Sequence, residues 1–399
     1  MSDPPLDVGA ILRQYAEQAG GADGPLTAPQ RQALRDLAAC RTPALGGRIE
    51  QCPACGLREY VYNSCRNRHC PKCQAGCRAA WLGREAGWLL PVEYHHLVFT
   101  LPQELVPLAV GNPRLVYGLL LEAASAAVRQ LAADPKYLGA QVGLTAGKHT
   151  WGQTLTLHPH LHVLATGGGL SCNRQGEVDE QPCWRSARPG FFLPVRPLGR
   201  LFQGKFLAGL RQAHARGALR LPAGWSGPGR LDAELRSLAR RDWVVYSQPP
   251  CAGAGVVLKY LARYTYRVAF SNRRLVRVAD EEVTFTWKDY RRHGRERERT
   301  LPRAEFARRF LQHVLPQGFV RTRHYGLLAN RGRDDKLRLA RRLLGAAGPQ
   351  AAAAAPPSPP ERQPGRCPGC GQGVMAVVEW LPRCPGGEGP PPARAADSS

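Results

Sequence analysis

The sequence contains no long apolar run of the kind that predicts a membrane-spanning segment. Its first ten residues, MSDPPLDVGA, lack the basic region followed by an apolar stretch that characterises a secretory signal peptide. No amphipathic basic helix with a strong aromatic face is evident, which argues against a protein of the membrane surface. We therefore expect a protein that stays in a reducing compartment, the cytoplasm, and has no membrane partner.

Acidic residues are scarce. The 399 residues include 55 Lys and Arg but only 31 Asp and Glu, which gives a formal net charge of +24 and an isoelectric point near 10.1. This surplus is larger than solubility requires. It predicts a polyanionic partner, for which nucleic acid is the usual choice and an anionic membrane surface the weaker alternative.

Cysteine, in contrast, is abundant and clustered. Seven of the 13 cysteines lie between residues 40 and 77, and in a reducing compartment such a cluster indicates metal binding rather than disulfides. Two Cys-x-x-Cys pairs, Cys52 with Cys55 and Cys70 with Cys73, are separated by fourteen residues. We expect their four thiolates to hold one structural Zn²⁺ in a tetrahedron with bonds of about 2.3 Å.

Further possible ligands leave the number of zinc ions open. A lone Cys-x-x-Cys pair at 367–370 is followed only by Cys384, so the sequence offers no complete second ribbon there. The residues of the N-terminal segment that could hold a second zinc ion or replace one of the four are Cys40, Cys65, His69 and Cys77.

The apolar pattern divides the chain into three parts. Residues 1–88 predict a helical and zinc-binding domain, residues 89–345 a larger domain, and residues 346–399 a Pro- and Ala-rich disordered tail. Within the larger domain, strand patterns (YHHLVFTLP, TLHPHLHVLAT, WVVYSQ) and a hairpin that turns at 279–281 are interspersed with helical patterns (NPRLVYGLLLEAASAAVRQLA, PRAEFARRFLQHVL). The fold class is therefore α/β (α+β), a mixed sheet covered by helices.

The segment HPHLHVLATGGGL at 158–170 places three histidines at alternate positions. Side chains at alternate positions of a strand share one face, so His158, His160 and His162 should point the same way. A single histidine is more often structural, but three alternating imidazoles favour a ligand role towards a divalent ion. A site with only two histidine ligands leaves coordination positions of the metal ion open, which suits catalysis.

A tyrosine pair follows about one hundred residues later, in GVVLKYLARYTYRVAFSNRRLVRV. If residues 256–264 are helical, as their composition indicates, Tyr260 and Tyr264 share one helix face. Such a pair usually packs in a core. Here basic neighbours favour the phenolate of a group whose ordinary pKa is near 10, so the tyrosines are candidate nucleophiles. These neighbours are Lys259, Arg263, Arg267, Arg273 and Arg274.

Together these motifs resemble a known family. HLH at 160–162 is a His–hydrophobic–His motif and YLARY at 260–264 is a Tyr-x-x-x-Tyr motif. With NSCRNRHCPKCQ, FTLP, TGGGL, YRVAFSNRRL and RHYGLLA, they resemble the two-tyrosine HUH transposases of rolling-circle insertion sequences, of the insertion-sequence-ninety-one type. The resemblance runs from about residue 30 to about residue 330. It implies an N-terminal transposase zinc-binding domain and, over 89–345, an HUH endonuclease-like catalytic domain with a central antiparallel sheet.

The resemblance also implies a catalytic metal, Mg²⁺ or Mn²⁺, beside the structural Zn²⁺. His160 and His162 would be its ligands. Gln153, seven residues before His160, would be the third ligand, with His158 and His149 as alternatives.

In this family, Tyr260 and Tyr264 would be the nucleophiles, and the nearby Tyr266 departs from the family pattern. The implied function is that of a transposase that nicks and rejoins single-stranded DNA at insertion-sequence ends through a 5′-phosphotyrosine intermediate. It would act in the bacterial cytoplasm, on the nucleoid, with single-stranded DNA of the element ends and the target as its partner. The residues expected to contact DNA are Arg66, Arg68, Lys72, Lys259, Arg263, Arg267, Arg273 and Arg274.

Three alternatives remain at this point. A plasmid relaxase or replication initiator would use the same chemistry on another DNA substrate. A non-catalytic zinc DNA-binding protein would bind DNA without forming a covalent adduct. A metallohydrolase that uses the histidine segment is less favoured, because no carboxylate has an obvious spacing for a two-metal site.

Overall fold

The computed structural model describes residues 6–18, 26–73, 81–250, 256–257, 268–345 and 366–384. Its centre is a six-stranded sheet with the order β11-β4-β5-β3-β7, in which β6 pairs with the far end of β5 and every pairing is antiparallel. The strands are β3 (Tyr94–Thr100), β4 (Ala140–Trp151), β5 (Leu157–Ser171), β6 (Trp184–Ser186), β7 (Val245–Ser247) and β11 (Thr322–Gly326). The predicted central antiparallel sheet is confirmed, and so are the strands expected in YHHLVFTLP, TLHPHLHVLAT and WVVYSQ, which are β3, β5 and β7.

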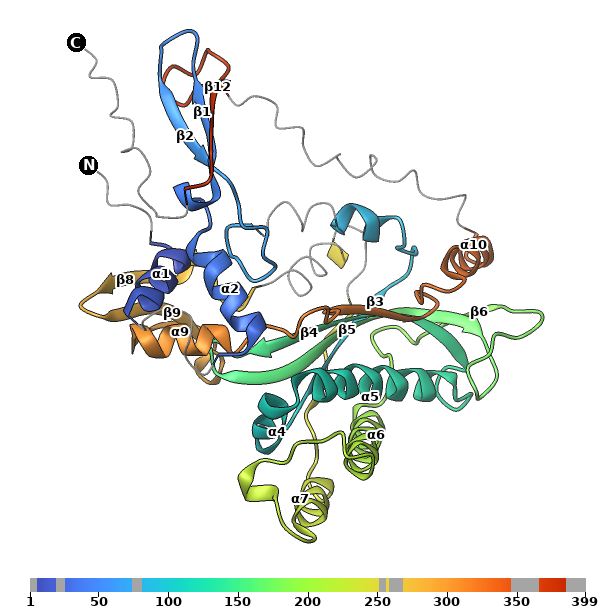
Figure 1. Ribbon diagram of the computed structural model, residues 1–399. Coiled ribbons are helices and arrows are strands. Elements are labelled where there is room, and N and C mark those ends of the chain that lie inside the picture. Colours follow the sequence, from blue (N-terminus) through green and yellow to red (C-terminus); the bar gives the residue numbers. More distant parts are fainter. Residues whose placement is uncertain are drawn as a thin grey trace.

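Helices cover one face of this sheet, as Figure 1 shows. The covering helices are α4 (Val106–Gly111), α5 (Pro113–Ala133), α6 (Val195–Ala215) and α7 (Arg230–Ala239). The main core lies between the two layers, where Phe99 and Leu161 of the sheet meet Leu120 of α5 and Phe202 of α6. Helix α5 begins at the predicted Pro113, a residue whose fixed φ suits the first turn.

Helix α5 is also the one described helix that is long and apolar enough to cross a membrane by length and composition. However, 61% of its most apolar 18-residue window is buried inside the protein, and ten of its side chains, among them Leu120 and Leu121, belong to the main core. It is therefore explained as the core helix of the sheet domain. Helix α10 (Arg333–Leu343) lies on the opposite side of the sheet from α5 (Figure 1).

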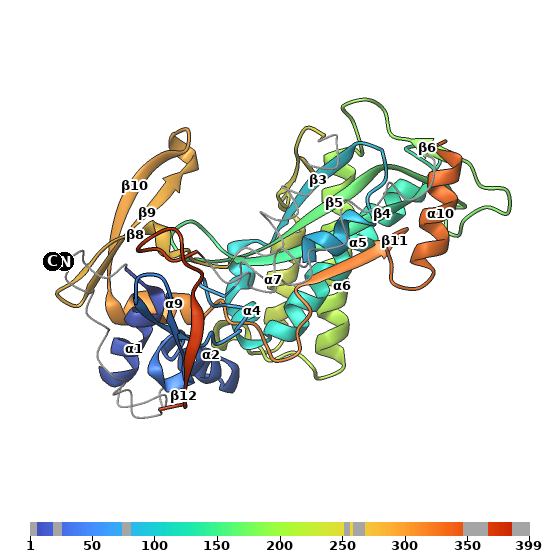
Figure 2. The same ribbon diagram turned by 90° about the horizontal axis from the view of Figure 1, so that it is seen from above.

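A second core joins the N-terminal helices to a later part of the chain. It contains α1 (Val8–Gln18), α2 (Ala28–Ala38), the sheet of β8 (Leu275–Ala279), β9 (Glu282–Asp289) and β10 (Arg295–Pro302), and α9 (Arg303–Leu311). The predicted hairpin turn is confirmed, because Asp280 and Glu281 between β8 and β9 have φ of 50° and 65°, as a two-residue hairpin turn requires. Figure 2 shows this body at the opposite end of the molecule from α10 and β6.

A third, small sheet has the order β12-β1-β2 and contains β1 (Gly47–Gln51), β2 (Arg58–Tyr62) and β12 (Ala376–Leu381). It brings a strand of the C-terminal tail beside the N-terminal hairpin, and it projects from the rest of the molecule (Figure 1). The prediction of a disordered tail is therefore corrected for residues 366–384, of which Ala376–Leu381 form β12 and pair with β1. The short 3₁₀ segments are Pro43–Leu45, Gln103–Leu105, Ala223–Trp225, Asn272–Arg274 and Tyr290–Arg292.

Lys148 of β4 is buried in the main layer interface. Its side chain is among the largest fully buried ones, and its Nζ finds no hydrogen-bond partner among the described residues. The Nζ atom lies 3.8 Å from the ring centroid of Tyr117 and 5.5 Å from that of Phe319. Burial lowers the pKa of Lys148 well below its usual value, and the charges of Arg321 and Arg68 act in the same direction. The amine thus lowers the stability of the core that contains it.

We predict that Lys148→Met stabilises the protein at pH 7 by about 1–3 kcal/mol, because Met fills a similar volume without a buried amine. Unfolded Lys148 is protonated below pH 10.5, whereas its folded-state pKa is depressed, so folding releases a proton. The gain should therefore grow as the pH falls from 10 to 7. Denaturant unfolding at several pH values measures it.

Lys136→Met is the matched control for this substitution, because Lys136 is exposed. It should change the free energy of unfolding by less than about 0.5 kcal/mol. A Lys148→Met variant that is less stable than the wild type at pH 7 would mean that Tyr117 and Phe319 retain a charged ammonium there.

Candidate active site and metal centres

Three histidines on adjacent strands form the candidate active site. Along β5 the side chains alternate as predicted, so that Leu161 is buried in the main core while His160 and His162 are half-buried on the opposite face. His149 of β4 lies directly across from His160 in the antiparallel register. One ring nitrogen of each histidine lies within 4.8 Å of those of the other two, which is close enough for all three to bind one metal ion.

Hydrogen bonds determine which nitrogen of each imidazole is available. The Nδ1–H of His160 donates to the backbone carbonyl of His158 at 2.7 Å, which leaves the lone pair on Nε2. The Nδ1 atom of His162 lies 2.9 Å from Nε2 of His96 on β3. Burial lowers the pKa of His96 to about 4, against a smaller opposing effect of its hydrogen bond with Gln248.

Because His96 is neutral at pH 7, its Nε2 lone pair can accept the Nδ1–H of His162. The lone pair of His162 is then on Nε2, as in His160. Histidine ligands of metal ions are commonly oriented in this way, by a hydrogen bond from the second ring nitrogen. No role was predicted for His96, since only the register of β3 on β5 brings it to His162.

The structure places the three proposed third ligands differently. Gln153 lies in the turn after β4, where its side-chain amide is 3.5 Å from the hydroxyl of Tyr290. His158 contacts His160 through its backbone carbonyl. His149, from the neighbouring strand, is the one that forms a cluster with His160 and His162.

The predicted nucleophiles and three of their basic neighbours lie outside the described residues; these are Tyr260, Tyr264, Lys259, Arg263 and Arg267. Immediately before them, residues 256–257 are helical, and Val257 is 1% exposed. Val257 packs with Tyr94 of β3 and Leu164 of β5. Leu164 is two residues beyond His162, so it shares its sheet face. The chain therefore packs on the histidine face of the sheet shortly before the tyrosine pair.

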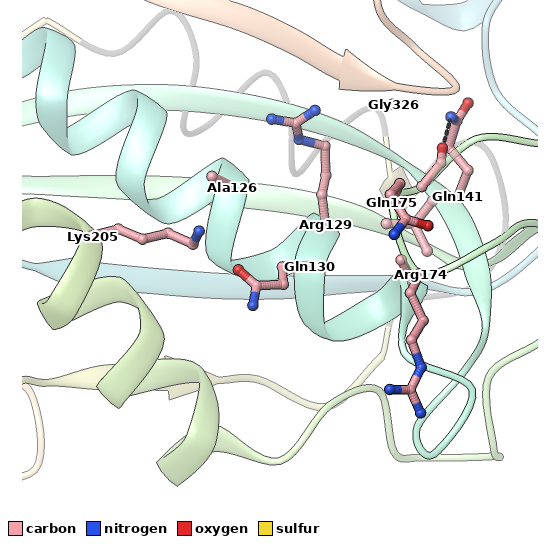
Figure 3. A pocket seen from close by; sticks show the side chains of 11 residues that line it. Ala126, Arg129, Gln130, Gln141, Arg174, Gln175, Lys205 and Gly326 are labelled. Carbon is pink, nitrogen blue, oxygen red and sulfur yellow. Dashed lines mark hydrogen bonds between the residues drawn. The ribbon is translucent and has the colours of Figure 1, made fainter.

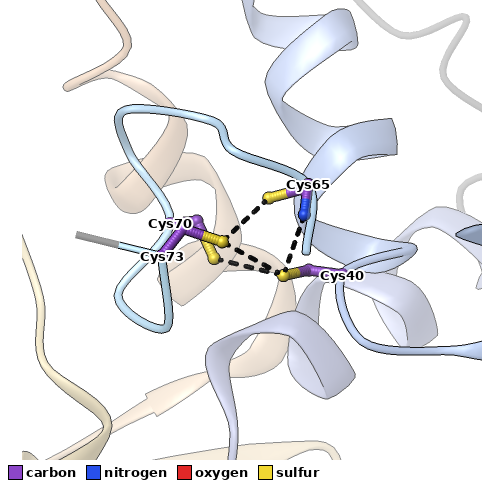
Figure 4. Close-up of side chains that lie close together, drawn as sticks. All are labelled: Cys40, Cys65, Cys70 and Cys73. Atoms are coloured by element: carbon purple, nitrogen blue, oxygen red, sulfur yellow. Dashed lines mark hydrogen bonds between the residues drawn. The ribbon is translucent and has the colours of Figure 1, made fainter. Parts of the chain in front are cut away.

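Four cysteines near the N-terminus form the first cysteine cluster (Figure 4), which consists of Cys40, Cys65, Cys70 and Cys73. The Sγ atom of Cys40 is 3.6 Å from that of Cys70 and 3.5 Å from that of Cys73, and the Sγ atoms of Cys65 and Cys73 are 3.7 Å apart. Sulfurs at the corners of a tetrahedron with Zn–S bonds of about 2.3 Å are about 3.8 Å apart. The cluster thus has the dimensions of a structural zinc site.

This grouping corrects the one predicted from the spacing, which had combined the pairs at 52–55 and 70–73. The pair at 52–55 instead belongs to a second cysteine cluster, which consists of Cys52, Cys55, Cys367 and Cys370. The reason is that Cys52 and Cys55 lie at the tip of the β1–β2 hairpin, away from the loop that carries Cys70. His69 is half-buried, and its desolvation lowers its pKa to about 3; its Nε2 accepts the N–H of Leu315 at 3.4 Å.

The basic residues predicted to contact DNA divide into two groups. Arg68 donates to two backbone carbonyls of the loop after α9, Lys72 donates at 2.7 Å to the carboxylate that precedes α1, and Arg274 donates to backbone carbonyls of β9 and of the β4–β5 turn. These three cations connect segments of the fold. Arg66 and Arg273 are exposed and remain the accessible candidates among the described residues.

A separate polar pocket of about 360 Å³ lies at the other end of the sheet, between helices and strands (Figure 3). Its lining includes Arg129 of α5, Lys205 of α6 and Arg174, and none of its described lining residues is acidic. Gln141 closes one side, where its Nε2 donates to the carbonyl of Gly176 at 2.6 Å. None of the predicted site residues is among the described residues that line this pocket.

Comparison with known proteins agrees with these features. Residues 143–336 match a family model described as "Putative transposase", and residues 11–101 match one described as "Transposase zinc-binding domain". The chain is 44% identical over 395 residues to "Putative transposase y4qJ" of Sinorhizobium fredii (strain NBRC 101917 / NGR234), which covers 95% of this chain and 98% of the relative. It is 28% identical over 319 residues to "Transposase for insertion sequence element IS801" of Pseudomonas savastanoi pv. phaseolicola, over 77% and 72% of the two chains. No solved structure matches it.

The chain is therefore a DNA transposase, in which a zinc-binding domain precedes a sheet that carries a histidine cluster. Within that class, the chain belongs to the insertion-sequence-ninety-one type, with an N-terminal transposase zinc-binding domain. The resemblance found in the motifs is confirmed.

We predict that Arg66→Ala weakens DNA binding several-fold without a change in stability, because the exposed side chain is free to contact a phosphate. It should also lower the slope of log affinity against log salt by about 0.7, the value for one phosphate contact on a single strand. Fluorescence anisotropy with a labelled oligonucleotide at several salt concentrations measures both.

Arg68→Ala is the contrasting variant. It removes the donors to two backbone carbonyls and should destabilise the protein by about 1–3 kcal/mol. If it instead reduced DNA affinity as much as Arg66→Ala while the protein kept its stability, the division between structural and accessible cations would not hold.

Proposed function

We propose that this transposase nicks and rejoins single-stranded DNA at the ends of its insertion sequence through a 5′-phosphotyrosine intermediate, in a reaction that depends on a divalent metal ion. The observation that carries the proposal is the cluster of His149, His160 and His162 on one sheet face. The segment that leads to the tyrosine pair packs on this same face through Val257, which supports a common site for metal and nucleophile.

The donor chemistry of the cluster supports a transition-metal ion. Neutral imidazoles favour first-row transition ions, whereas Mg²⁺ prefers oxygen ligands. Of the two ions expected from the sequence, Mn²⁺ therefore fits the three histidines better. Bound there, the ion would polarise the scissile phosphate and offset the negative charge that develops on its oxygens.

Chain connectivity supports Tyr260 as a nucleophile. It follows Val257, which packs on the histidine face, by only three residues in the sequence. In the proposed step, the phenolic oxygen bonds to phosphorus as the bond from phosphorus to the 3′ oxygen breaks. The phenol loses its proton and the 3′ oxygen gains one. Attack by another 3′ hydroxyl reverses the step and needs no ATP, because the phosphotyrosine conserves the bond.

Strand β3 contributes to this site by holding His162. His96 is buried and contacts His162 Nδ1, so it keeps the ring in one orientation and leaves Nε2 for the ion. A ligand oriented in advance loses less entropy on binding metal, which supports a role for His96 as a positioning residue.

The alternatives are less well supported. A plasmid relaxase or replication initiator would share this chemistry, but both family regions that match are those of transposases. A non-catalytic zinc DNA-binding protein would have no use for three imidazoles at one point of the sheet. Covalent attachment to insertion-sequence ends is the property that neither alternative shares.

We predict that His160→Ala with His162→Ala abolishes the covalent adduct while DNA binding stays within about threefold of wild type. His149→Ala alone should reduce adduct formation at least tenfold, as expected for the loss of a ligand from a three-histidine site. The measurement is incubation with end-labelled single-stranded element ends and Mn²⁺, followed by denaturing electrophoresis.

His158→Ala is the matched control, because it removes an imidazole from the same strand face while the backbone carbonyl that orients His160 remains. It should form the adduct normally. Gln153→Ala tests the other third ligand: if it blocks the adduct and His149→Ala does not, the ligand set proposed from the cluster is incorrect.

We predict that Tyr260→Phe and Tyr264→Phe each lose transposition but remain folded and able to bind DNA, because Phe keeps the ring and removes the hydroxyl. Phenols four residues apart would share one face of the helix that the sequence predicts, so that one could cut the donor strand while the other takes the next strand. Tyr266, about 200° around a helix from Tyr264, should be replaceable by Phe. Loss of the adduct in Tyr266→Phe alone would contradict this assignment. Denaturing electrophoresis measures adduct formation in each variant, and transposition is counted separately.

A further inference from the structure

The second cysteine cluster joins segments from opposite ends of the chain. Cys52 and Cys55 lie between β1 and β2, whereas Cys367 and Cys370 precede β12. The Sγ atoms of Cys52 and Cys370 are 3.7 Å apart, and those of Cys55 and Cys367 are 3.5 Å apart. All four lie within 4.8 Å of one another, in agreement with the sulfur–sulfur distance of about 3.8 Å in a four-thiolate zinc site.

The two halves of the cluster repeat one local conformation. Their sequences are CPACG at 52–56 and CPGCG at 367–371. The N–H of Gly56 donates to the carbonyl of Cys52 at 2.9 Å, and the N–H of Gly371 donates to that of Cys367 at 2.9 Å. Both glycines have a positive φ, of 72° and 68°. Two matching knuckles that face each other are the arrangement by which zinc ribbons enclose an ion.

Backbone N–H groups point at the sulfurs of the C-terminal half. Gly369 donates to Sγ of Cys367 and Gly373 donates to Sγ of Cys370, each at 3.4 Å. Such bonds stabilise the thiolate, which is the form that binds zinc. The packing is also close, because a Cβ added to Gly373 would lie 2.3 Å from Sγ of Cys52.

Hydrophobic burial does not explain why the C-terminal segment is held there. Among the described residues, the buried apolar side chains around the second cysteine cluster are those of Cys52, Cys367 and Met375. Along β12 the apolar side chains are largely exposed, with Trp380 at 72% and Val378 at 49%. A small sheet with so little core needs another source of folding free energy, and metal binding supplies it in zinc ribbons.

We propose that the second cysteine cluster is a structural Zn²⁺ site with four thiolate ligands, which fastens residues 366–384 to the β1–β2 hairpin. Neither family region that matches the chain, 11–101 or 143–336, includes Cys367 and Cys370. Each chain then holds two structural zinc ions, one in the first cysteine cluster and one between its two ends. This assignment does not depend on the phosphotyrosine chemistry.

The test is the zinc content of the purified full-length chain, measured with His160→Ala and His162→Ala present in every sample so that the histidine cluster adds no zinc. With its cysteines as in the wild type, this chain should contain two zinc ions. The pair Cys367→Ser with Cys370→Ser and the pair Cys52→Ser with Cys55→Ser should each contain one. The four substitutions combined should also leave one, because both pairs belong to the same site. Cys384→Ser, in the same tail but outside the cluster, is the matched control and should retain two.

Several results would overturn the proposal: one zinc in the chain with wild-type cysteines, two in the Cys367 and Cys370 variant, or none in the fourfold variant.

A second measurement, on the wild type, does not depend on the folding of any variant. Amide hydrogen exchange in β12 should be slow in the zinc-loaded chain and should speed up at least tenfold after a chelator removes zinc. Gly373→Ala should have the same effect without chelator, and unchanged protection in both cases would contradict the proposal.

Discussion

The pairing of β4 with β5 is the contact on which the candidate site depends. Because the strands are antiparallel and in a fixed register, His149 lies opposite His160, and the alternation of β5 adds His162 on the same face. The same alternation turns Leu161 and Val163 into the core against α5 and α6. A slip of one residue would bury the imidazoles and expose the apolar side chains, so the free energy that stabilises the sheet also assembles the site.

The second cysteine cluster lies where the apolar core is insufficient. The central sheet has a large helix-covered core, and the first cysteine cluster borders the second core, but few apolar side chains are buried around the second cysteine cluster. Four thiolates bound to one metal ion contribute a large binding free energy from only four residues, and they can join segments that are distant in sequence. The proposed second site closes a loop of more than three hundred residues, between Cys52 and Cys370. Closing so long a loop removes considerable entropy from the unfolded chain.

Much of this could be predicted from the sequence, and the limits have a physical cause. Alternation at 158–162 and helical spacing in α5 are local patterns, so the strand, its face and the helix were predicted correctly. Cysteine spacing, in contrast, shows that knuckles exist but not which of them meet. That depends on β12 pairing with β1 across the whole chain. His149 and His96 likewise join the site only through strand register, which single-strand patterns do not contain.

The charge of the chain illustrates the same distinction between composition and position. A surplus of +24 indicates a polyanionic partner, and transposase membership agrees with it. Yet Arg68 and Arg274 donate to backbone carbonyls, and Lys148 is enclosed in the core. Guanidinium groups are suited to this second role, because several N–H donors on one plane can satisfy carbonyls of separate loops at once. The cations that can contact DNA are therefore fewer than the 55 Lys and Arg residues of the chain, and exposure rather than residue type identifies them.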